Sequence, residues 1–471
     1  MAKAAGVQRE TLFPGDQGLP DARDVIDERS LFGQTGWASL YPESRNALYL
    51  VLDDGWDVGY GLDPWGKGDM PKFGTHLLNE LRFPSLRGTA AERLRQLNNR
   101  IRECGWRGAG IWVACQCQDE THEKHRSDLQ TREELKRKLS ESAEAGIDYW
   151  KVDWGIRDLD SEFRVLMSEL RDSYHPELHI EHKPLYGQPI LPEDFEETAD
   201  CSFNRAVLGT NDILRTYDVL PPLDHVSTLA RVAAYSQVID RIGSRSLINV
   251  EDEVYMGAAL GHAFGVMRSD GTLATEVLRA VRWQESSPAF GGDAAVRTLV
   301  SQDRLVDECR YADTVWYSPA RGRVMSQRAP AVIARGLPLP EVRVTSGERP
   351  FVVASRNPNG ATVVCVVPRV AQGKEKQLPD IVLDYSAGSG APLAVFGFVR
   401  SMSVKDERRV GTVLAADLAD GEWHDITASV SRANGRMVLD GTVLNQIGRE
   451  NNPKGDSSSP GVRIAFCEKF S

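Results

Sequence analysis

Residues 131–153 read TREELKRKLSESAEAGIDYWKVD. Thr131-Arg-Glu-Glu134 predicts a helix start, because a threonine and a glutamate at this spacing can satisfy backbone amides reciprocally in a capping box. Apolar residues then recur at four-residue spacing until Gly146, a residue typical of helix ends. An apolar run over 147–152 follows and ends at Asp153. A helix that leads directly into such a run is part of a βαβ unit, so this stretch predicts a parallel sheet.

The same alternation extends in both directions along the chain. A second capping box, Thr89-Ala-Ala-Glu92, predicts a helix that stops near Gly105, and a third helix is expected over 161–172. Strand-like runs accompany these helices, at 36–40, 48–52, 109–114, 147–152, 178–182, 211–217, 246–250 and 264–267. Eight such runs with intervening helices predict an α/β fold, a (β/α)8 TIM barrel, which we assign to residues 1–312.

The pattern changes after residue 315. Helical periodicity is lost, and Pro, Gly and Asn separate short runs rich in Val, Thr and Ile, at 342–345, 351–354, 361–367, 393–398, 411–415 and 462–466. Residues 451–460 form a polar, loop-like segment before the last run. These features favour a C-terminal antiparallel β-sandwich-like domain, which we assign to residues 313–471.

The charge of the chain limits its partners. Its 471 residues include 56 basic and 67 acidic side chains, which gives a net charge of −11. A protein that binds a phosphate backbone needs a basic face, so a nucleic-acid partner is not expected. No apolar run is long enough to cross a bilayer, and no signal-peptide core is recognisable, so no membrane partner is expected either. Homo-oligomer formation stays open.

The seven cysteines have no paired zinc spacing, and their number is odd. Most stand among apolar residues, which is typical of reduced, buried thiols rather than of a disulfide framework. We therefore expect a cytoplasmic protein without a structural metal.

Charged and aromatic side chains follow several of the predicted strands. In a barrel the carboxyl ends of the strands meet at one mouth, where catalytic groups lie. Carboxylates flanked by aromatic side chains and hydrogen-bonding charges are what glycoside cleavage uses. The candidate residues are Asp53, Asp54, Trp56, Trp112, Lys151, Asp153, Glu181, His182, Arg215 and Asp218.

Motifs at these strand ends resemble those of a known group of glycosidases. Residues 146–153, GIDYWKVD, are similar to the nucleophile motif on the fourth strand of α-galactosidase families 27 and 36. The other similar segments, in the order of those families, are Asp53-Asp-Gly-Trp56, Gly110-Ile-Trp112, Lys183-Pro-Leu-Tyr186 and Arg215-Thr-Tyr-Asp218. The resemblance covers residues 33–270 and implies a barrel followed by a β domain.

The resemblance also implies a reaction. It is the hydrolysis of terminal α-galactoside-type bonds by a retaining exo-glycosidase that needs no cofactor. Asp153 would attack the anomeric carbon and form a glycosyl-enzyme ester, and Asp218 would act first as acid and then as base. In retaining glycosidases such a carboxyl pair lies about 5–5.5 Å apart. Lys151 would keep Asp153 ionised, because residues two apart in a strand point to the same side.

Other candidates would bind the carbohydrate substrate. By the resemblance, Asp53 and Asp54 would accept hydrogen bonds from the O4 and O6 hydroxyls of the sugar, and Arg215 would lie near its 2-hydroxyl. Trp56 would offer an apolar wall, and Trp112 is either a second wall or a core residue.

The strand over 178–182 leaves two candidates for the pocket. Alignment on Pro184 favours His182, whereas strand alternation favours Glu181. Both therefore stay in the candidate set.

Two other functions fit parts of the pattern. A metal-dependent barrel hydrolase or isomerase would draw on the histidines at 122, 125, 175, 179 and 182, although neither HExxH nor HxH spacing occurs. A transglycosylating or carbohydrate-binding relative would bind sugar with little hydrolysis. Among glycosidase substrates, a β-L-arabinopyranoside is an alternative, because it shares the ring stereochemistry of galactose and lacks its hydroxymethyl group.

Overall fold

The computed structural model describes residues 25–61, 73–121, 123–185, 199–216, 223–267, 273–291, 296–311, 323–369, 377–406 and 410–468. The chain divides into two compact units. The first comprises Met1–Leu185, Cys201–Arg215 and Met267–Gly271, and the second comprises Tyr186–Asp200, Thr216–Val266 and Thr272–Ser471. The domain boundary that the sequence predicts at 312/313 stays a prediction.

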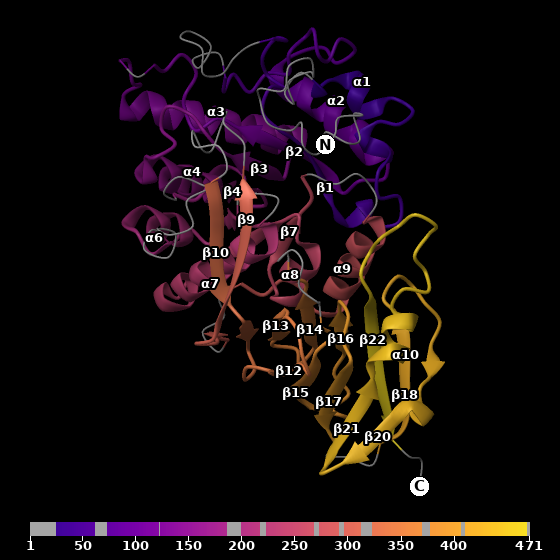
Figure 1. The fold of residues 1–471 in the computed structure, drawn as a ribbon. Coiled ribbons are helices and arrows are strands. Elements are labelled where there is room, and N and C mark those ends of the chain that lie inside the picture. The colour runs from indigo at the N-terminus through magenta and orange to yellow at the C-terminus, as the bar shows by residue number, and fades with distance from the viewer. Residues whose placement is uncertain are drawn as a thin grey trace. The chain divides into compact units, whose positions relative to one another are not determined.

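Seven parallel strands form one sheet in chain order (Figure 1). They are β1 (Tyr49–Leu52), β2 (Gly108–Val113), β3 (Tyr149–Val152), β4 (His179–His182), β5 (Ile213–Arg215), β6 (Leu247–Glu251) and β7 (Ala263–Gly265). The helices that alternate with them are α2 (Ala90–Glu103), α3 (Asp128–Ala145), α4 (Ser161–Tyr174), α6 (Ser202–Leu208), α7 (Asp224–Ile242), α8 (Val254–Ala259) and α9 (Ala274–Ser286). This curled sheet with its helices is consistent with the predicted (β/α)8 barrel.

The segment before β1 differs from the prediction. Residues Trp37–Ser39 form a 3-10 helix, so the strand expected at 36–40 is wrong. Helix α1 (Glu28–Phe32) precedes it, and a second 3-10 helix (Arg45–Ala47) follows it. Trp37 is buried, and the Ala38 carbonyl accepts hydrogen bonds from the Trp106 indole and the Arg45 side chain. Side-chain packing, rather than strand pairing, therefore fixes this segment.

Two helix starts show how capping decides a boundary. The box between Thr89 and Glu92 is present at the start of α2, as predicted. Helix α3 begins one turn before its predicted start, because Ser127 and Gln130 form the capping box instead. The predicted end is confirmed, since Gly146 takes the left-handed conformation with φ of +67°.

The C-terminal part of the second unit is rich in sheet (Figure 1). One sheet has the order β19-β18-β22-β16-β14-β13-β11-β8, and another has the order β12-β15-β17-β21-β20. The strands of the first are β8 (Thr298–Val300), β11 (Val332–Arg335), β13 (Phe351–Arg356), β14 (Thr362–Val367), β16 (Leu393–Phe396), β18 (Val410–Asp417), β19 (His424–Asp425) and β22 (Gly461–Glu468). The strands of the second are β12 (Glu341–Arg343), β15 (Asp380–Ser386), β17 (Ser401–Lys405), β20 (Val430–Ala433) and β21 (Arg436–Asp440). Strands β9 (Arg304–Tyr311) and β10 (Arg323–Pro330) form a separate antiparallel pair.

These two sheets pack face to face over one apolar core, which confirms the sandwich-like architecture. Alternate residues of β15 and β17 meet residues of β13, β14, β16 and β22 in this core. Most strand pairs are antiparallel, while β11–β13, β14–β16 and β15–β17 are parallel. Helix α10 (Gly441–Ile447) was not expected, since helical periodicity is lost in this region of the sequence. Leu444 and Ile447 join the core from this helix.

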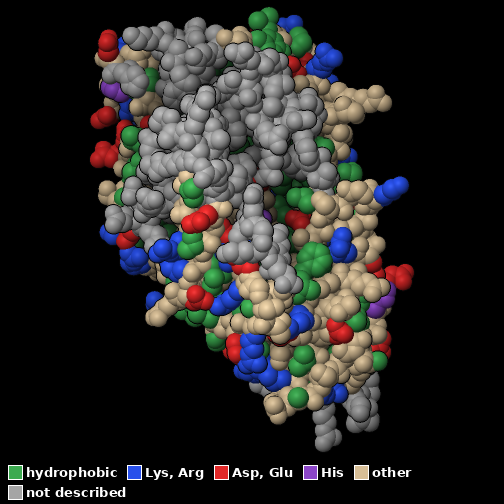
Figure 2. All heavy atoms as spheres, viewed as in Figure 1, with side chains coloured by type: hydrophobic (Ala, Val, Ile, Leu, Met, Phe, Trp, Pro, Cys, Tyr) green, Lys and Arg blue, Asp and Glu red, His purple; other side chains and the backbone are tan. Residues whose placement is uncertain are grey.

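Six cysteines in the described residues are free thiols, and Cys115, Cys117 and Cys365 are buried. Within the described ranges, no helix is both long and apolar enough to span a bilayer. Acidic and basic side chains are interspersed over the described part of the face drawn in Figure 2.

Candidate active site

Strand register brings the predicted residues to one side of the sheet. Trp112 of β2 pairs in register with Lys151 of β3, and Lys151 pairs with Glu181 of β4. Asp153 lies two residues beyond Lys151, so its side chain returns to the same side. Glu181 pairs with Ile213 of β5, and Arg215, two residues beyond Ile213, returns to that side as well. We call this side of the sheet the site face.

Residues of the opposite side contact helices. The Trp150 indole donates to Ser142 Oγ of α3 at 2.9 Å. His182 Nε2 lies 3.3 Å from Ser168 Oγ of α4 and 3.3 Å from Asp212 Oδ2. The structure thus places Glu181 on the site face, and it places His182 on the helix-covered side, in contact with Ser168 and Asp212.

Asp153 follows β3 directly and is held at both carboxylate oxygens. Arg215 Nη2 lies 2.6 Å from Oδ1, and the Trp112 indole donates to Oδ2 at 3.3 Å. Arg164 donates to the backbone carbonyl of Asp153 at 3.1 Å, which fixes the strand end. Asp153 and Arg215 are both buried, so their attraction is only weakly screened.

The charges around Asp153 keep it ionised. Burial alone raises the pKa of this carboxyl. The positive charges of Arg215, Lys151 and Lys183, with the hydrogen bond from Trp112, outweigh burial and lower the net pKa below its ordinary value of 3.8. Asp153 is therefore a carboxylate at neutral pH, which is the form that a nucleophile requires.

Lys151 and Asp53 form a second ion pair on the site face. Lys151 Nζ lies 3.0 Å from Oδ1 and 2.9 Å from Oδ2 of Asp53, and it lies 3.8 Å from Met267 Sδ. Lys151 is buried, while the Asp53 side chain is 20% exposed. Lys151 therefore acts on Asp153 through its charge while it bonds to Asp53.

Asp54 is bound to an aromatic cluster next to this pair. Its Oδ2 accepts a hydrogen bond from the Trp154 indole at 3.0 Å. The Trp154 ring lies 5.0 Å from Trp112 and 4.8 Å from Phe73, measured between ring centroids. Neighbouring carboxylates at 53 and 54 thus have different partners, one cationic and one aromatic.

Both predicted tryptophans are almost fully buried. The Trp56 indole donates to the Trp112 carbonyl at 2.9 Å, so its polar edge supports β2. The Trp112 indole instead points its N–H at Asp153. Their contacts make Trp56 a packing residue and Trp112 a group that orients the carboxylate.

Glu181 links β3, β4 and β5. Its Oε2 accepts a hydrogen bond from the Tyr149 hydroxyl, and its Oε1 lies 3.6 Å from Arg215 Nη1. Arg215 therefore faces the carboxylates of both Asp153 and Glu181. Sequence reasoning missed Tyr149, although its position two residues before Lys151 puts it on the same side of β3.

The segments that follow β2 and β3 are joined closely. Cys115 N donates to the Trp154 carbonyl at 3.0 Å. A Cβ at Gly155 would stand 2.5 Å from the Cys115 carbonyl oxygen, so only glycine permits this approach. The buried Glu120 forms an ion pair with Arg157 at 2.6 Å just beyond. This bracing holds Asp153 and Trp154 in place.

Asp218, the predicted acid/base, lies in 217–222, outside the described residues. His122 lies outside them too. Across the described ranges, no group of three or more His, Cys, Asp or Glu side chains is arranged to hold a metal ion. His175 Nε2 lies 2.9 Å from the Ile147 carbonyl oxygen and His182 contacts Asp212, so each has a protein partner.

No protein-family model matches this chain, and no curated protein matches it. Solved structures similar to it include a GH27 β-L-arabinopyranosidase from Geobacillus stearothermophilus, with 12% identity, coverage of 88% of each chain and a TM-score of 0.41. Another is α-galactosidase I from Mortierella vinacea, with 11% identity, coverage of 92% of each chain and a TM-score of 0.39. A third is an α-galactosidase from Saccharomyces cerevisiae, with 10% identity, coverage of 91% of each chain and a TM-score of 0.36.

Proposed function

We propose that this chain is a retaining exo-glycosidase that hydrolyses terminal α-galactoside-type bonds, with Asp153 as its nucleophile. The observation that carries the proposal is the surroundings of Asp153. Its carboxylate ends a parallel strand, lies between Arg215 and Trp112, and has a lowered pKa. Active sites of parallel α/β folds lie at such strand ends.

The first step forms a bond between Asp153 and the sugar. An oxygen of the carboxylate attacks the anomeric carbon as the bond from that carbon to the leaving oxygen breaks. Each oxygen of the bound carboxylate has lone pairs beyond the one used by Arg215 or Trp112.

The leaving oxygen takes a proton from the general acid, and water then hydrolyses the ester with the conjugate base accepting its proton. The resemblance assigns this role to Asp218. Two displacements at the anomeric carbon return the product with retained configuration.

The ion pairs of the site face supply the sugar contacts. The Asp53 and Asp54 carboxylates follow β1, and each has accepting capacity left beyond Lys151 or Trp154. Glu181 presents a third carboxylate beside Arg215. Neighbouring ring hydroxyls, as in a galactose or arabinopyranose ring, match this set of separate acceptors and cations.

The test is hydrolysis of a panel of aryl α- and β-glycosides, including α-galactoside and β-L-arabinopyranoside, with and without EDTA. We expect one of these sugars to be cleaved with retention, visible as the first-formed anomer by NMR. Asp153→Asn should lower kcat by at least about a thousandfold. EDTA should have no effect.

Asp212→Asn is the matched control. Asp212 is also a buried acid paired with an arginine, Arg171, but it lies against α4. This variant should keep near-wild-type kcat. Equal rates for Asp153→Asn and wild type, or an inverted product, would contradict the proposal, and loss of activity in EDTA would favour the metal-dependent alternative.

A further inference from the structure

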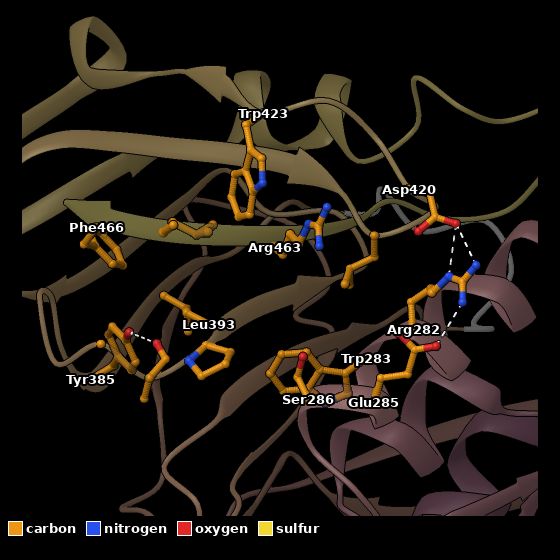
Figure 3. Close-up of a pocket in the computed structure, with 16 residues that line it drawn as sticks. Arg282, Trp283, Glu285, Ser286, Tyr385, Leu393, Asp420, Trp423, Arg463 and Phe466 are labelled. Atoms are coloured by element: carbon orange, nitrogen blue, oxygen red, sulfur yellow. Dashed lines mark hydrogen bonds and ion pairs between the residues drawn. The ribbon is translucent and has the colours of Figure 1, made fainter.

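A cavity of about 340 Å³ lies in the second unit between α9, the start of β16, the middle of β22 and the loop before β19 (Figure 3). Its volume falls within the range of small-molecule sites. None of its lining residues belongs to the candidate active site. It is therefore a separate candidate for binding.

One part of the cavity wall is apolar. The side chains of Phe466, Leu393 and Tyr385 lie there, with Trp423 across from them (Figure 3). Trp423 remains 46% exposed, although an indole is one of the largest apolar surfaces a protein can bury. An exposed indole beside a cavity is suited to stack on a ring-shaped ligand.

The other end carries four charges. Arg282 is engaged, since its Nε and Nη2 lie 3.0 and 2.9 Å from Asp420 Oδ2 and its Nη1 lies 2.9 Å from Glu285 Oε1. The side chains of Asp420 and Glu285 remain more than half exposed, so each can accept further hydrogen bonds.

Arg463 is the fourth charge, and its situation differs. Its guanidinium carbon lies 4.7 Å from the centre of the Trp423 ring. Its Nε is buried and makes no hydrogen bond within the described residues. The Nε itself is closed to a ligand, but Arg463 lines the cavity and a guanidinium carries five N–H donors, so its other N–H groups can donate to a ligand there.

We propose that this cavity binds a neutral, polyhydroxylated ring, that is, a mono- or oligosaccharide. Two arginines and two carboxylates leave the cavity without net charge, which favours a neutral ligand over an ionic one. Sugar hydroxyls can both accept a hydrogen bond from Arg463 and donate one to Asp420 or Glu285. The apolar face of the ring would stack on Trp423. This second site goes beyond the proposed function. Only the choice of a galactoside as one of the probes rests on that function.

The test follows the indole N–H resonance of Trp423 by NMR, assigned by its loss in Trp423→Phe. Asp153→Asn protein is titrated with methyl α-galactoside, maltose and sodium galacturonate, each up to about 50 mM, a range that detects millimolar binding. A saturable shift with a neutral sugar is expected. Arg463→Gln should weaken that binding at least about tenfold.

Tyr174→Ala is the matched control, because Tyr174 is likewise an exposed aromatic residue with a cation, Lys136, over its ring. It lies on α4 and is not among the residues that line the cavity, so its loss should leave the titration unchanged. No shift with either neutral sugar, or binding of galacturonate alone, would overturn the proposal. If the wild type hydrolyses no glycoside but the Trp423 resonance still shifts with a neutral sugar, the proposed function is refuted and this site stands.

Discussion

Arg215 Nη2 lies 2.6 Å from Asp153 Oδ1, and both side chains are buried at the ends of strands β5 and β3, which lie on either side of β4. The arginine spans β4 to reach the carboxylate, and on the way it passes within 3.6 Å of Glu181. The state of Asp153 therefore depends on a residue more than sixty positions away in the sequence.

Arg215→Gln should move the acid limb of the kcat/KM profile to higher pH. The reason is that the Arg215 charge is the largest influence that lowers the pKa of Asp153, while burial, which raises it, remains in the variant. The measurement is kcat/KM from pH 3 upward, on the glycoside that the wild type cleaves. Arg171→Gln, which removes a similar ion pair with Asp212, should leave the limb in place. An unmoved limb in Arg215→Gln would show that another group governs it.

Lys151 and Asp53 should behave as one unit. Lys151→Met and Asp53→Asn each break the same pair of contacts at 2.9 and 3.0 Å, so either substitution should lower kcat/KM by about tenfold or more. The double variant should lose little beyond the worse single variant, because interacting residues are not additive. Steady-state kinetics of the four proteins gives the coupling. Simple addition of the two losses would mean that the residues act separately.

Asp57 should make stability depend on pH. It is buried, its Oδ2 accepts from the backbone amides of Gly74 and Thr75, and burial raises its pKa from 3.8 to about 6. Between these values the unfolded chain releases the proton while the folded chain keeps it, so stability falls as pH rises through this window. The cost at neutral pH is about 3 kcal/mol, at 1.36 kcal/mol for each pKa unit.

Asp57→Asn keeps the acceptor oxygen and removes this titration. Urea unfolding of both proteins at about pH 4 and pH 7 gives the check. The free energy of unfolding of the wild type, relative to the variant, should drop by about 2 kcal/mol between the two pH values, because the unfolded carboxyl is already partly ionised at pH 4. A difference that stays constant with pH would place the pKa of Asp57 at its ordinary value.

Arg279 and Asp417 should be essential to the stability of the second unit. Two parallel contacts of 2.7 Å join them, both side chains are fully buried, and they link α9 to the end of β18. Asp417→Asn should lower the free energy of unfolding by about 3–5 kcal/mol, because it leaves a buried arginine without its counter-charge. Arg343→Met, which breaks the exposed pair with Glu341, should be neutral. Chemical denaturation measures both, and a similar small effect in the two variants would contradict the prediction.

Much of the sheet could be predicted from the sequence because its signals are local. The runs predicted at 48–52, 109–114, 147–152 and 178–182 are short and apolar and alternate with capped helices, and a strand lies at each of them in the structure. The strand prediction at 36–40 is wrong because a buried tryptophan between a glycine and a leucine is as compatible with a strand as with the 3-10 helix that forms there.

The sequence predicts which residues form the site better than it predicts the contacts that they make. Strand alternation places Lys151 and Asp153 on the same side of β3. It places Tyr149 on that side too, although the sequence analysis did not select this residue. That the Trp56 indole would bond to a backbone carbonyl, and that Trp154 would bond to Asp54, depends on loops that meet only in the folded chain. The contacts of His182 with Ser168 and Asp212 likewise join residues that meet only in the folded chain.

The most direct test of the account is to trap the covalent ester on Asp153. A 5-fluoro-α-galactosyl fluoride reacts with a retaining α-galactosidase by losing fluoride, and its ring fluorine slows hydrolysis of the ester. Mass spectrometry of the intact chain should show one added fluorogalactosyl group, and peptide mapping should place it on Asp153, with none in Asp153→Asn. A label on another carboxylate, such as Asp53 or Glu181, in an enzyme that cleaves α-galactosides would contradict the assignment.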